Sequence, residues 1–178
     1  RAGAFLRDPL VGEHLRTMGV EGALGERLEA AELMKTVPED PRTDQALWTM
    51  LDDEDVEVRL RAYEALADRN NPQLRRTPVA GKFMLDMVDS DYPMIYISQS
   101  KMPRIAVFGQ DLAVDRPIAM SAWDNRLLVQ NAIEDQDKVE IYYQPATGGV
   151  TRIVESDANA HDLIKFLARR PTPDDPQP

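Results

Sequence analysis

An internal repeat is the feature of this 178-residue sequence that most limits its fold. When the chain is shifted by 32 residues, two stretches align with later ones, and the shift stays constant between them. The identities are Leu15/Leu47, Thr17/Thr49, Met18/Met50, Arg27/Arg59, Leu28/Leu60, Ala30/Ala62 and Glu32/Glu64. A period of this length is typical of stacked helical hairpins, so two copies of a helix, turn, helix unit are predicted.

The second copy shows the pattern more clearly. Its first helix is predicted from Thr43 to Leu51, with Thr43 as the N-cap after Pro41, and its second from about Val56 to Arg69. Apolar residues in both recur three and four positions apart, as they do on a buried helix face. The acidic turn at 52–55 precedes the second helix, where negative charge favours the free N–H groups.

The first copy is predicted to hold helices at about Pro9 to Met18, ended by Gly19, and about Gly25 to Val37, closed by Pro38. Neither hairpin can cover its own apolar face, so stacking on a neighbour must bury it. Two repeats are few for an independent stack. We therefore expect further repeats before Arg1 and a cap formed by the part of the chain that follows.

That following part is rich in strand patterns. A linker is predicted from Asn70-Asn71-Pro72 to Thr77-Pro78, because Asn and Pro end a helix. Short runs of β-branched and aromatic residues then recur about every ten residues, separated by turn residues such as Asp124-Asn125 and Thr147-Gly148-Gly149. The predicted strands are Phe83 to Val88, Met94 to Ile97, Arg104 to Phe108, Ile118 to Trp123, Arg126 to Ile133, Lys138 to Tyr143 and Val150 to Val154.

The whole chain is therefore predicted to be α+β. Residues 1–74 form helical repeats, and residues 80–170 form a small antiparallel meander that curls into a sandwich or barrel and ends in a helix. That helix is expected to start at Ser156 or Asp157 as N-cap and to bury Ala160, Leu163, Ile164 and Leu167. The proline-rich tail, residues 171–178, is expected not to fold.

Charge and composition exclude several classes of function. The net charge of −10, with only isolated basic pairs at Arg75-Arg76 and Arg169-Arg170, argues against binding to nucleic acids or anionic membranes. No cysteine is present, which excludes disulfides and thiol chemistry, and no apolar run is long enough to span a membrane. Because the chain begins Arg1-Ala2-Gly3, without a signal-peptide core, we expect a mature product or a segment of a longer protein.

Asp86, Asp89 and Asp91 are the residues that come nearest to a metal or catalytic motif. Oxygen ligands at this density could hold calcium. However, the glycine and glutamate that an EF-hand needs at its sixth and twelfth positions are replaced by Asp91 and Ile97, so a solvated loop is preferred and a cation is the alternative. Asp52 to Asp55 are explained by the helix that follows them.

The other candidate residues lack the partners that chemistry requires. His14 and His161 lie far apart and have no metal-ligand spacing, so both are expected to be ordinary surface or half-buried residues. No serine lies in a nucleophile motif, and the glycines form no phosphate loop. Trp48 and Trp123 are expected in the core or at its edge, with a binding interface as the alternative, and Arg59 is expected to bond the acidic turn of its own or the next repeat. The serines considered are Ser90, Ser98, Ser100, Ser121 and Ser156. No catalytic, cofactor-binding or metal-binding residue is assigned.

The run Asp55-Val56-Glu57-Val58-Arg59-Leu60-Arg61-Ala62-Tyr63-Glu64-Ala65-Leu66 resembles the second helix of a HEAT-type repeat, and Arg27 to Met34 resembles it more loosely. The resemblance covers about residues 8 to 70. It implies an interaction scaffold that binds proteins, without a cofactor.

A second resemblance covers about residues 40 to 170. The hairpin followed by 92–100, then 103–109, Pro117-Ile118 and 126–129 is similar to the carboxyl-terminal region of large planctomycete proteins related to the flagellar P-ring protein. This implies a non-enzymatic role in the periplasm or cell envelope, in bacterial motility, with self-assembly or flagellar rod components as partners. No functional residue carries over, because the ring-forming amino-terminal part of that family is not in this chain.

Three hypotheses follow. The first is a non-catalytic structural or scaffold protein of the cell envelope. The second is a hydrolase or lyase with a carboxylate site made of Asp86, Asp89 and Asp91 with Asp111, which requires these side chains to converge in a pocket. The third is a cytoplasmic peptide-binding adaptor.

Overall fold

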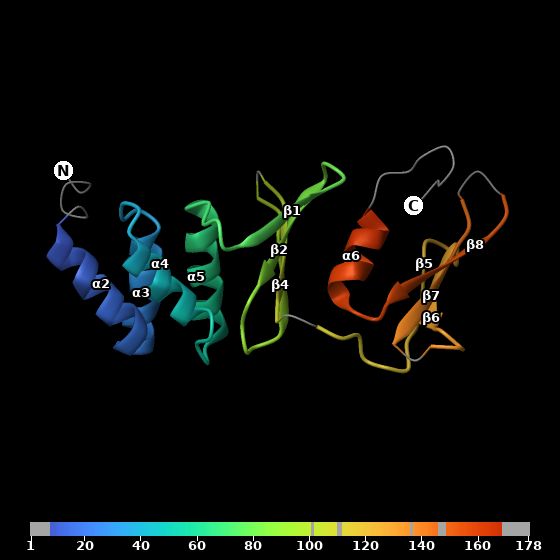
Figure 1. Cartoon of the computed structure of the whole chain (residues 1–178), viewed down its shortest axis with the longest axis horizontal. Coiled ribbons are helices and arrows are strands. Elements are labelled where there is room, and N and C mark those ends of the chain that lie inside the picture. Colours follow the sequence, from blue (N-terminus) through green and yellow to red (C-terminus); the bar gives the residue numbers. More distant parts are fainter. Residues whose placement is uncertain (1–7, 101, 110–111, 136, 146–148, 169–178) are drawn as a thin grey trace.

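The computed structural model describes residues 8–100, 102–109, 112–135, 137–145 and 149–168. Its elements follow one another along the molecule in chain order, except for the last helix (Figure 1). Four helices come first, then a four-stranded sheet, and a second four-stranded sheet at the other end. The last helix, α6, lies between the two sheets. The prediction of an α+β fold is confirmed.

The helices form two hairpins that stack side by side. The first consists of α2 (Pro9–Glu21) and α3 (Leu24–Met34), and the second of α4 (Pro41–Met50) and α5 (Val56–Asp68). Helix α2 packs on α4 and α3 packs on α5, so equivalent helices of the two hairpins lie next to each other. Stacking buries the apolar stripe that each hairpin leaves open, as the sequence predicts.

Both hairpins begin in the same way. The carboxylate of Asp8 accepts a hydrogen bond from the Leu10 N–H, and the carboxylate of Asp40, 32 residues later, accepts one from the Arg42 N–H. Each aspartate is followed by a proline at the first helical position, where a missing N–H costs nothing. The prediction of Thr43 as an N-cap is therefore wrong: Asp40 caps α4, and Thr43 is buried inside it.

Gly19 does not end its helix, contrary to the prediction, since α2 continues to Glu21. A Cβ at this position would lie 2.9 Å from Met34 Cε and 3.0 Å from Met50 Sδ. The glycine thus permits both methionine side chains to approach the backbone of α2. Its role is close packing between the hairpins.

The first sheet consists of β1 (Arg75–Val79), β2 (Phe83–Val88), β3 (Met94–Ser98) and β4 (Arg104–Phe108), in the order β1-β2-β4-β3. Strands β2 and β4 are parallel, so the prediction of a wholly antiparallel meander is wrong here. The burial of the strands explains the order: the last three residues of β4 are buried on both faces, which suits a central strand, whereas β3 exposes Ile95 and Ile97 and lies at the edge.

Strand β1 lies within the stretch predicted as a linker. Pro78 misled the prediction, because proline usually excludes a strand. Here the strand pairs with β2 alone and forms the other edge of the sheet, where proline is tolerated.

The second sheet is the antiparallel meander that the sequence predicts. Strands β5 (Ala119–Ala122), β6 (Leu127–Asn131), β7 (Lys138–Tyr143) and β8 (Arg152–Asp157) pair in chain order. The predicted turn at Asp124 and Asn125 joins β5 to β6, with φ values of 57° and 64°.

Helix α6 (Ala160–Ala168) packs between the two sheets. Ile164 and Ala168 contact the first sheet, and Leu163, Phe166 and Leu167 contact the second. The predicted barrel does not form, because each sheet is hydrogen-bonded only within itself and the helix fills the space between them. The predicted caps Ser156 and Asp157 lie in β8; instead the Asn159 side chain accepts a hydrogen bond from the Asp162 N–H at 2.8 Å.

Candidate functional site

The carboxylates that the sequence groups together are separated in space. Asp86 on β2 points toward α5 and is fully buried, where it accepts a hydrogen bond from the Tyr63 hydroxyl at 2.7 Å. Arg76 Nε and Nη2 donate to the two oxygens of Asp86 at 2.8 and 3.2 Å. Asp89 and Asp91 lie beyond the end of β2, in a different groove. Asp111 lies outside the described residues.

The Tyr63–Asp86–Arg76 group joins helix α5 to the first sheet. Burial, followed by the hydrogen bond to Asp86, raises the pKa of Tyr63 well above its ordinary value. The hydrogen bond to Asp86 also raises the pKa of Arg76. Both oxygens of Asp86 are taken up by these donors, which is how a buried carboxylate is normally satisfied. The arrangement stabilises the joint and leaves Asp86 no free oxygen facing a substrate.

Asp89 and Asp91 line a groove of about 420 Å³ at the turn between α4 and α5. The Asp91 N–H donates to Asp52 Oδ1 at 2.7 Å, and the Ser90 hydroxyl donates to the Leu51 carbonyl at 2.9 Å. These bonds dock the β2–β3 loop on the second hairpin. Trp48, predicted at the edge of the core, is half-buried here.

A cavity of about 160 Å³ lies on the seam between α5 and the first sheet. The Tyr96 hydroxyl donates to Glu64 Oε1 at 2.7 Å, which raises the pKa of Tyr96, and Arg104 Nη1 lies 3.6 Å from Asp68. Ser98 and Ser100 also line the cavity, but a serine nucleophile requires an adjacent base. The carboxylates of this cavity, Glu64 and Asp68, are instead paired with Tyr96 and Arg104. The residues that line it are Tyr63, Glu64, Asp68, Tyr96, Ser98, Ser100 and Arg104.

The histidines and the remaining serines lie apart from these grooves. His14 is exposed on α2, and His161 is half-buried on α6 with Nδ1 3.1 Å from Asp162 Oδ1. Ser121 is in β5 and Ser156 in β8. Within the described ranges, no group of three or more histidines and acids is arranged to hold a metal ion.

Arginines form the most extensive polar contacts between elements. Arg59 Nη1 donates to the carbonyls of Asp53 and Glu54, at 2.6 and 3.0 Å, in the turn before its own helix. Its guanidinium carbon lies 4.7 Å from the centre of the Tyr92 ring, a cation–π contact with the loop between β2 and β3. The predicted bond from Arg59 to the acidic turn of its own repeat is confirmed.

Arg27 occupies the equivalent position in the first hairpin. Its Nη1 donates to the Gly22 carbonyl at 3.1 Å, which matches the bond from Arg59 to Glu54 at an offset of 32 residues. Its guanidinium also reaches forward to Asp53 of the second hairpin, with Nε 2.8 Å from Oδ2. One arginine position therefore links each hairpin to the unit that follows it.

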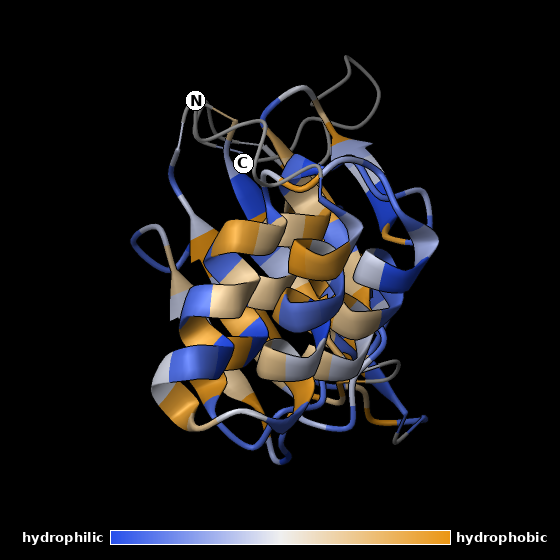
Figure 2. Cartoon of the chain, turned by 90° about the vertical axis from the view of Figure 1, so that its left-hand side faces the viewer, coloured by the Kyte–Doolittle hydropathy of each residue, from blue (hydrophilic) through white to orange (hydrophobic). Residues whose placement is uncertain are grey.

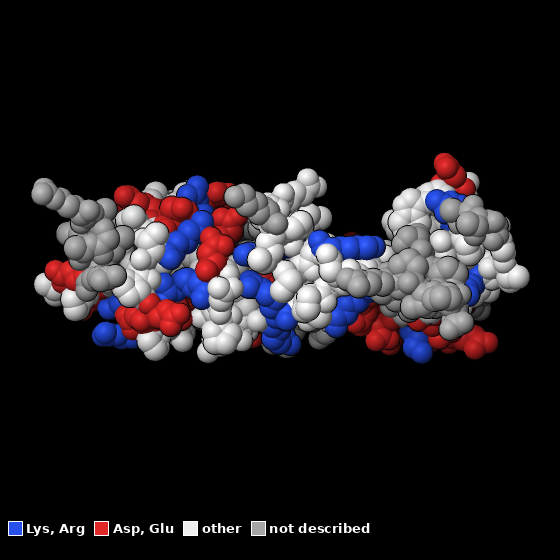
Figure 3. Space-filling model, turned by 90° about the horizontal axis from the view of Figure 1, so that it is seen from above, with Lys and Arg blue, Asp and Glu red and all other residues white. Residues whose placement is uncertain are grey.

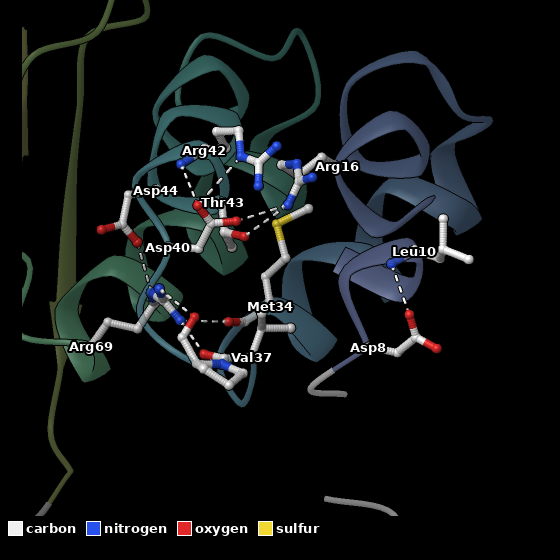
Figure 4. A network of polar contacts seen from close by, with 11 residues as sticks. Asp8, Leu10, Arg16, Met34, Val37, Asp40, Arg42, Thr43, Asp44 and Arg69 are labelled. Atoms are coloured by element: carbon white, nitrogen blue, oxygen red, sulfur yellow. Dashed lines mark hydrogen bonds and ion pairs between the residues drawn. The ribbon is translucent and has the colours of Figure 1, made fainter. Parts of the chain in front are cut away.

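Two further arginines were missed by the sequence analysis. Arg16 on α2 reaches Asp40 at 3.0 Å, and Arg69 at the end of α5 binds Asp44 at 2.8 Å and the carbonyls of Met34 and Val37 (Figure 4). The signal for Arg16 was available, because Asp8-Pro9 and Asp40-Pro41 also match at the 32-residue offset.

The surface of the helical part carries charges of both signs (Figure 3). Lysine and arginine lie beside aspartate and glutamate there, as the ion pairs within and between the hairpins indicate. Trp123, predicted at the edge of the core, is instead 42% exposed in the turn between β5 and β6. In the part of the chain that is described, no helix is both long and apolar enough to cross a membrane. Comparisons of the chain with protein-family models, with curated proteins and with solved structures found no match.

Proposed function

We propose that this chain is a non-catalytic structural module that binds other proteins. The observation that carries the proposal concerns Asp86, the most deeply buried carboxylate of the described residues. Arg76 and Tyr63 hold it, and it ties α5 to the first sheet. The contacts of Arg16, Arg27 and Arg69 likewise join one helix to another. Such an arrangement supports a rigid body with extended exposed faces, which suits a scaffold.

The two hairpins are proposed to be HEAT-like repeats. Support comes from three matched features at the 32-residue offset: the Asp-Pro start of the first helix, the arginine on the second helix, and the bond from that arginine to the preceding turn. Repeats of this kind offer helix faces to partners.

A place in the cell envelope is proposed from the resemblance to the P-ring-like planctomycete proteins. In this proposal the partners are other copies of the chain or components of the flagellar rod. Fractionation of the producing cells with an antibody to the chain tests it: the chain is expected in the periplasmic or envelope fraction, and recovery in the cytoplasm would favour the adaptor alternative.

Photo-crosslinking in the producing cells tests the scaffold function. A crosslinkable residue is placed singly at exposed positions of the helices, Thr17, Glu29 and Val56, and at Asp124 in the β5–β6 turn as a comparison. A scaffold is expected to give adducts of one mass at a subset of these positions. The absence of any adduct at all four positions would contradict the proposal.

A further inference from the structure

The first hairpin has one covered side and one open side. On the covered side, Thr43 accepts a hydrogen bond from Arg16 at 3.5 Å, and Met50 Sδ lies 3.0 Å from where a Cβ on Gly19 would stand. Thr43 and Met50 therefore mark the stripe of α4 that faces α2. The stripe also contains Ala46, and all three residues are buried.

The same stripe on α2 is less well covered: Val11 and Met18 pack only at the edge of the core that the two hairpins share, and α3 and α4 are the described elements that pack extensively on α2. The counterparts of Thr43, Ala46 and Met50 at the 32-residue offset are Val11, His14 and Met18. Val11 and Met18 are only half-buried and His14 is exposed. Figure 2 looks along the molecule from this end, and the nearest helices show hydrophobic as well as hydrophilic residues. Side chains at positions that are buried in the second hairpin are thus partly or fully open to solvent in the first.

Two acids lie at the ends of α2, Asp8 as its N-cap and Glu21 as its last residue. In the second hairpin, Asp40 and Asp53 each receive an arginine from the hairpin before it, Arg16 at 3.0 Å and Arg27 at 2.8 Å.

The counterparts of these acids are Asp8 and Glu21, and both are exposed. Asp8 caps α2 through Leu10, and no arginine of the described ranges reaches Asp8 or Glu21. In Figure 4, Asp40 lies in a cluster with Arg16 and Arg42, whereas Asp8 stands apart.

We propose that the open α2–α3 end, defined by Asp8, Val11, His14, Met18 and Glu21, binds a further helical hairpin built like α2–α3. The partner presents one arginine to Asp8 and a second, eleven residues later as Arg27 is from Arg16, to Glu21. It presents a glycine or alanine to Met18, as Gly19 faces Met50. This rests on the proposed scaffold function and names the partner that fits one face.

Charge complementarity favours a hairpin with two arginines as the partner over the open α2–α3 end of another copy of this chain. The open end of another copy carries the same Asp8 and Glu21, so two such ends would bring like charges together. A hairpin with arginines at both places supplies the opposite charge in the arrangement that Arg16 and Arg27 already use within the chain.

Duplicating the first hairpin tests the proposal. A copy of residues 8–39 is inserted before Asp8 in the full chain, which keeps the 32-residue period. The copies of Arg16 and Arg27 then face Asp8 and Glu21. Hydrogen exchange of α2 and α3 in the original hairpin is expected to slow about tenfold or more, since their open side becomes covered.

The matched control carries Arg16→Gln and Arg27→Gln in the inserted copy only, and is expected to lose most of this protection. An inserted hairpin that stays unfolded would overturn the proposal, because stacking on α2 and α3 is what should fold it. Equal protection by the control would also overturn it, as the acids would then play no part in recognition. A dimer of the unmodified chain with protected α2 amides would identify a second copy as occupant instead. None of these outcomes would contradict the scaffold function itself, because the crosslinking test of that function also probes other faces of the molecule.

Discussion

Arg27 of the first hairpin and Asp53 of the second form an ion pair in which Nη2 donates to Oδ1 at 3.1 Å and Nε lies 2.8 Å from Oδ2. Their side chains are only 17% and 12% exposed, which limits screening by solvent. Arg59 donates to the backbone carbonyl of the same Asp53. A single turn therefore receives arginines from two successive hairpins, and this turn is a principal joint of the helical stack.

The contribution of this pair can be measured by a double-mutant cycle with Arg27→Gln and Asp53→Asn. Because the pair is largely buried and hydrogen-bonded, we expect a coupling free energy of about 1 to 2 kcal/mol in urea unfolding. The exposed pair Arg61–Glu57 on α5 is the comparison and should couple by about 0.5 kcal/mol or less. Equal coupling in the two cycles would show that burial of Arg27 and Asp53 does not strengthen their bond.

Asp86→Asn should be among the most destabilising single changes in the chain. The substitution leaves Arg76 beside a neutral amide in a buried site, and removing one partner of a buried pair costs about 3 to 5 kcal/mol. Urea or thermal unfolding measures the change. Tyr63→Phe removes one hydrogen bond to Asp86 while Arg76 remains, so it should cost about 1 to 2 kcal/mol.

Asp91→Asn is the matched control for Asp86→Asn, since Asp91 comes from the same acidic stretch of sequence but is exposed. Its free energy of unfolding should stay within about 0.5 kcal/mol of the parent chain. If Asp91→Asn were as costly as Asp86→Asn, the distinction between a buried structural aspartate and a solvated one would be wrong.

Gly19→Leu tests the close packing between the hairpins. A side chain at this position meets Met34 and Met50, and overfilling a packed interface costs about 1 to 3 kcal/mol. Gly25→Leu is the control, because no atom lies within 4 Å of its added Cβ. It should leave stability unchanged or raise it slightly, by virtue of the better helix propensity of leucine. The free energy of unfolding of the two variants is measured under the same conditions. If Gly19→Leu left it unchanged, Gly19 would not be closely packed against Met34 and Met50.

Asp40 should contribute to the acid sensitivity of the fold. The hydrogen bond from the Arg42 backbone N–H, with Arg42 and Arg16 nearby, lowers the pKa of Asp40 below its usual 3.8. A lowered pKa in the folded state means that the stabilisation is present above pH 3.8 and is lost as the pH falls below that value toward the folded pKa.

Asp40→Asn keeps the helix cap but removes the charge, so its unfolding midpoint should change less between pH 6 and pH 3 than that of the parent chain. Asp40 observed by NMR in Arg16→Gln should titrate at a higher pH than in the parent, because one nearby cation is gone. A titration that does not move would show that Arg16 does not contribute to the lowered pKa.

The helical half of the fold could be predicted because its signals are local. The apolar spacing and the position of Arg59 lie within single hairpins, and the constant offset shows that the unit repeats. Helix α5 begins and ends close to where the sequence places it. The errors there have local causes too. A helix end is predicted at Gly19 because glycine is common at helix ends, whereas Gly19 lets Met34 and Met50 approach α2, a contact that exists only once the hairpins stack.

The arrangement of the strands depends on contacts that periodicity does not contain. The sequence from Met94 to Phe108 does not predict that β4 pairs in parallel with β2 and that β3 lies at the edge of the sheet. The separation of Asp86 from Asp89 and Asp91 has the same origin: Asp86 faces α5 because Tyr63 and Arg76 meet it there, and those partners are 23 and 10 residues away in sequence. Strand β1 is not predicted from the sequence, because proline usually argues against a strand and Pro78 is tolerated only since β1 lies at the edge of the sheet.

The first sheet stacks on the second hairpin and completes the helical stack as one folded body. Native-state hydrogen exchange at increasing denaturant measures this most directly, with α5 and β4 as reporters on the two sides of the Tyr63–Phe108 contact, whose ring centres are 5.7 Å apart. The account predicts that amides of both elements exchange through one opening with the same free energy. Opening of β4 at a much lower free energy, while α5 stays protected, would contradict it.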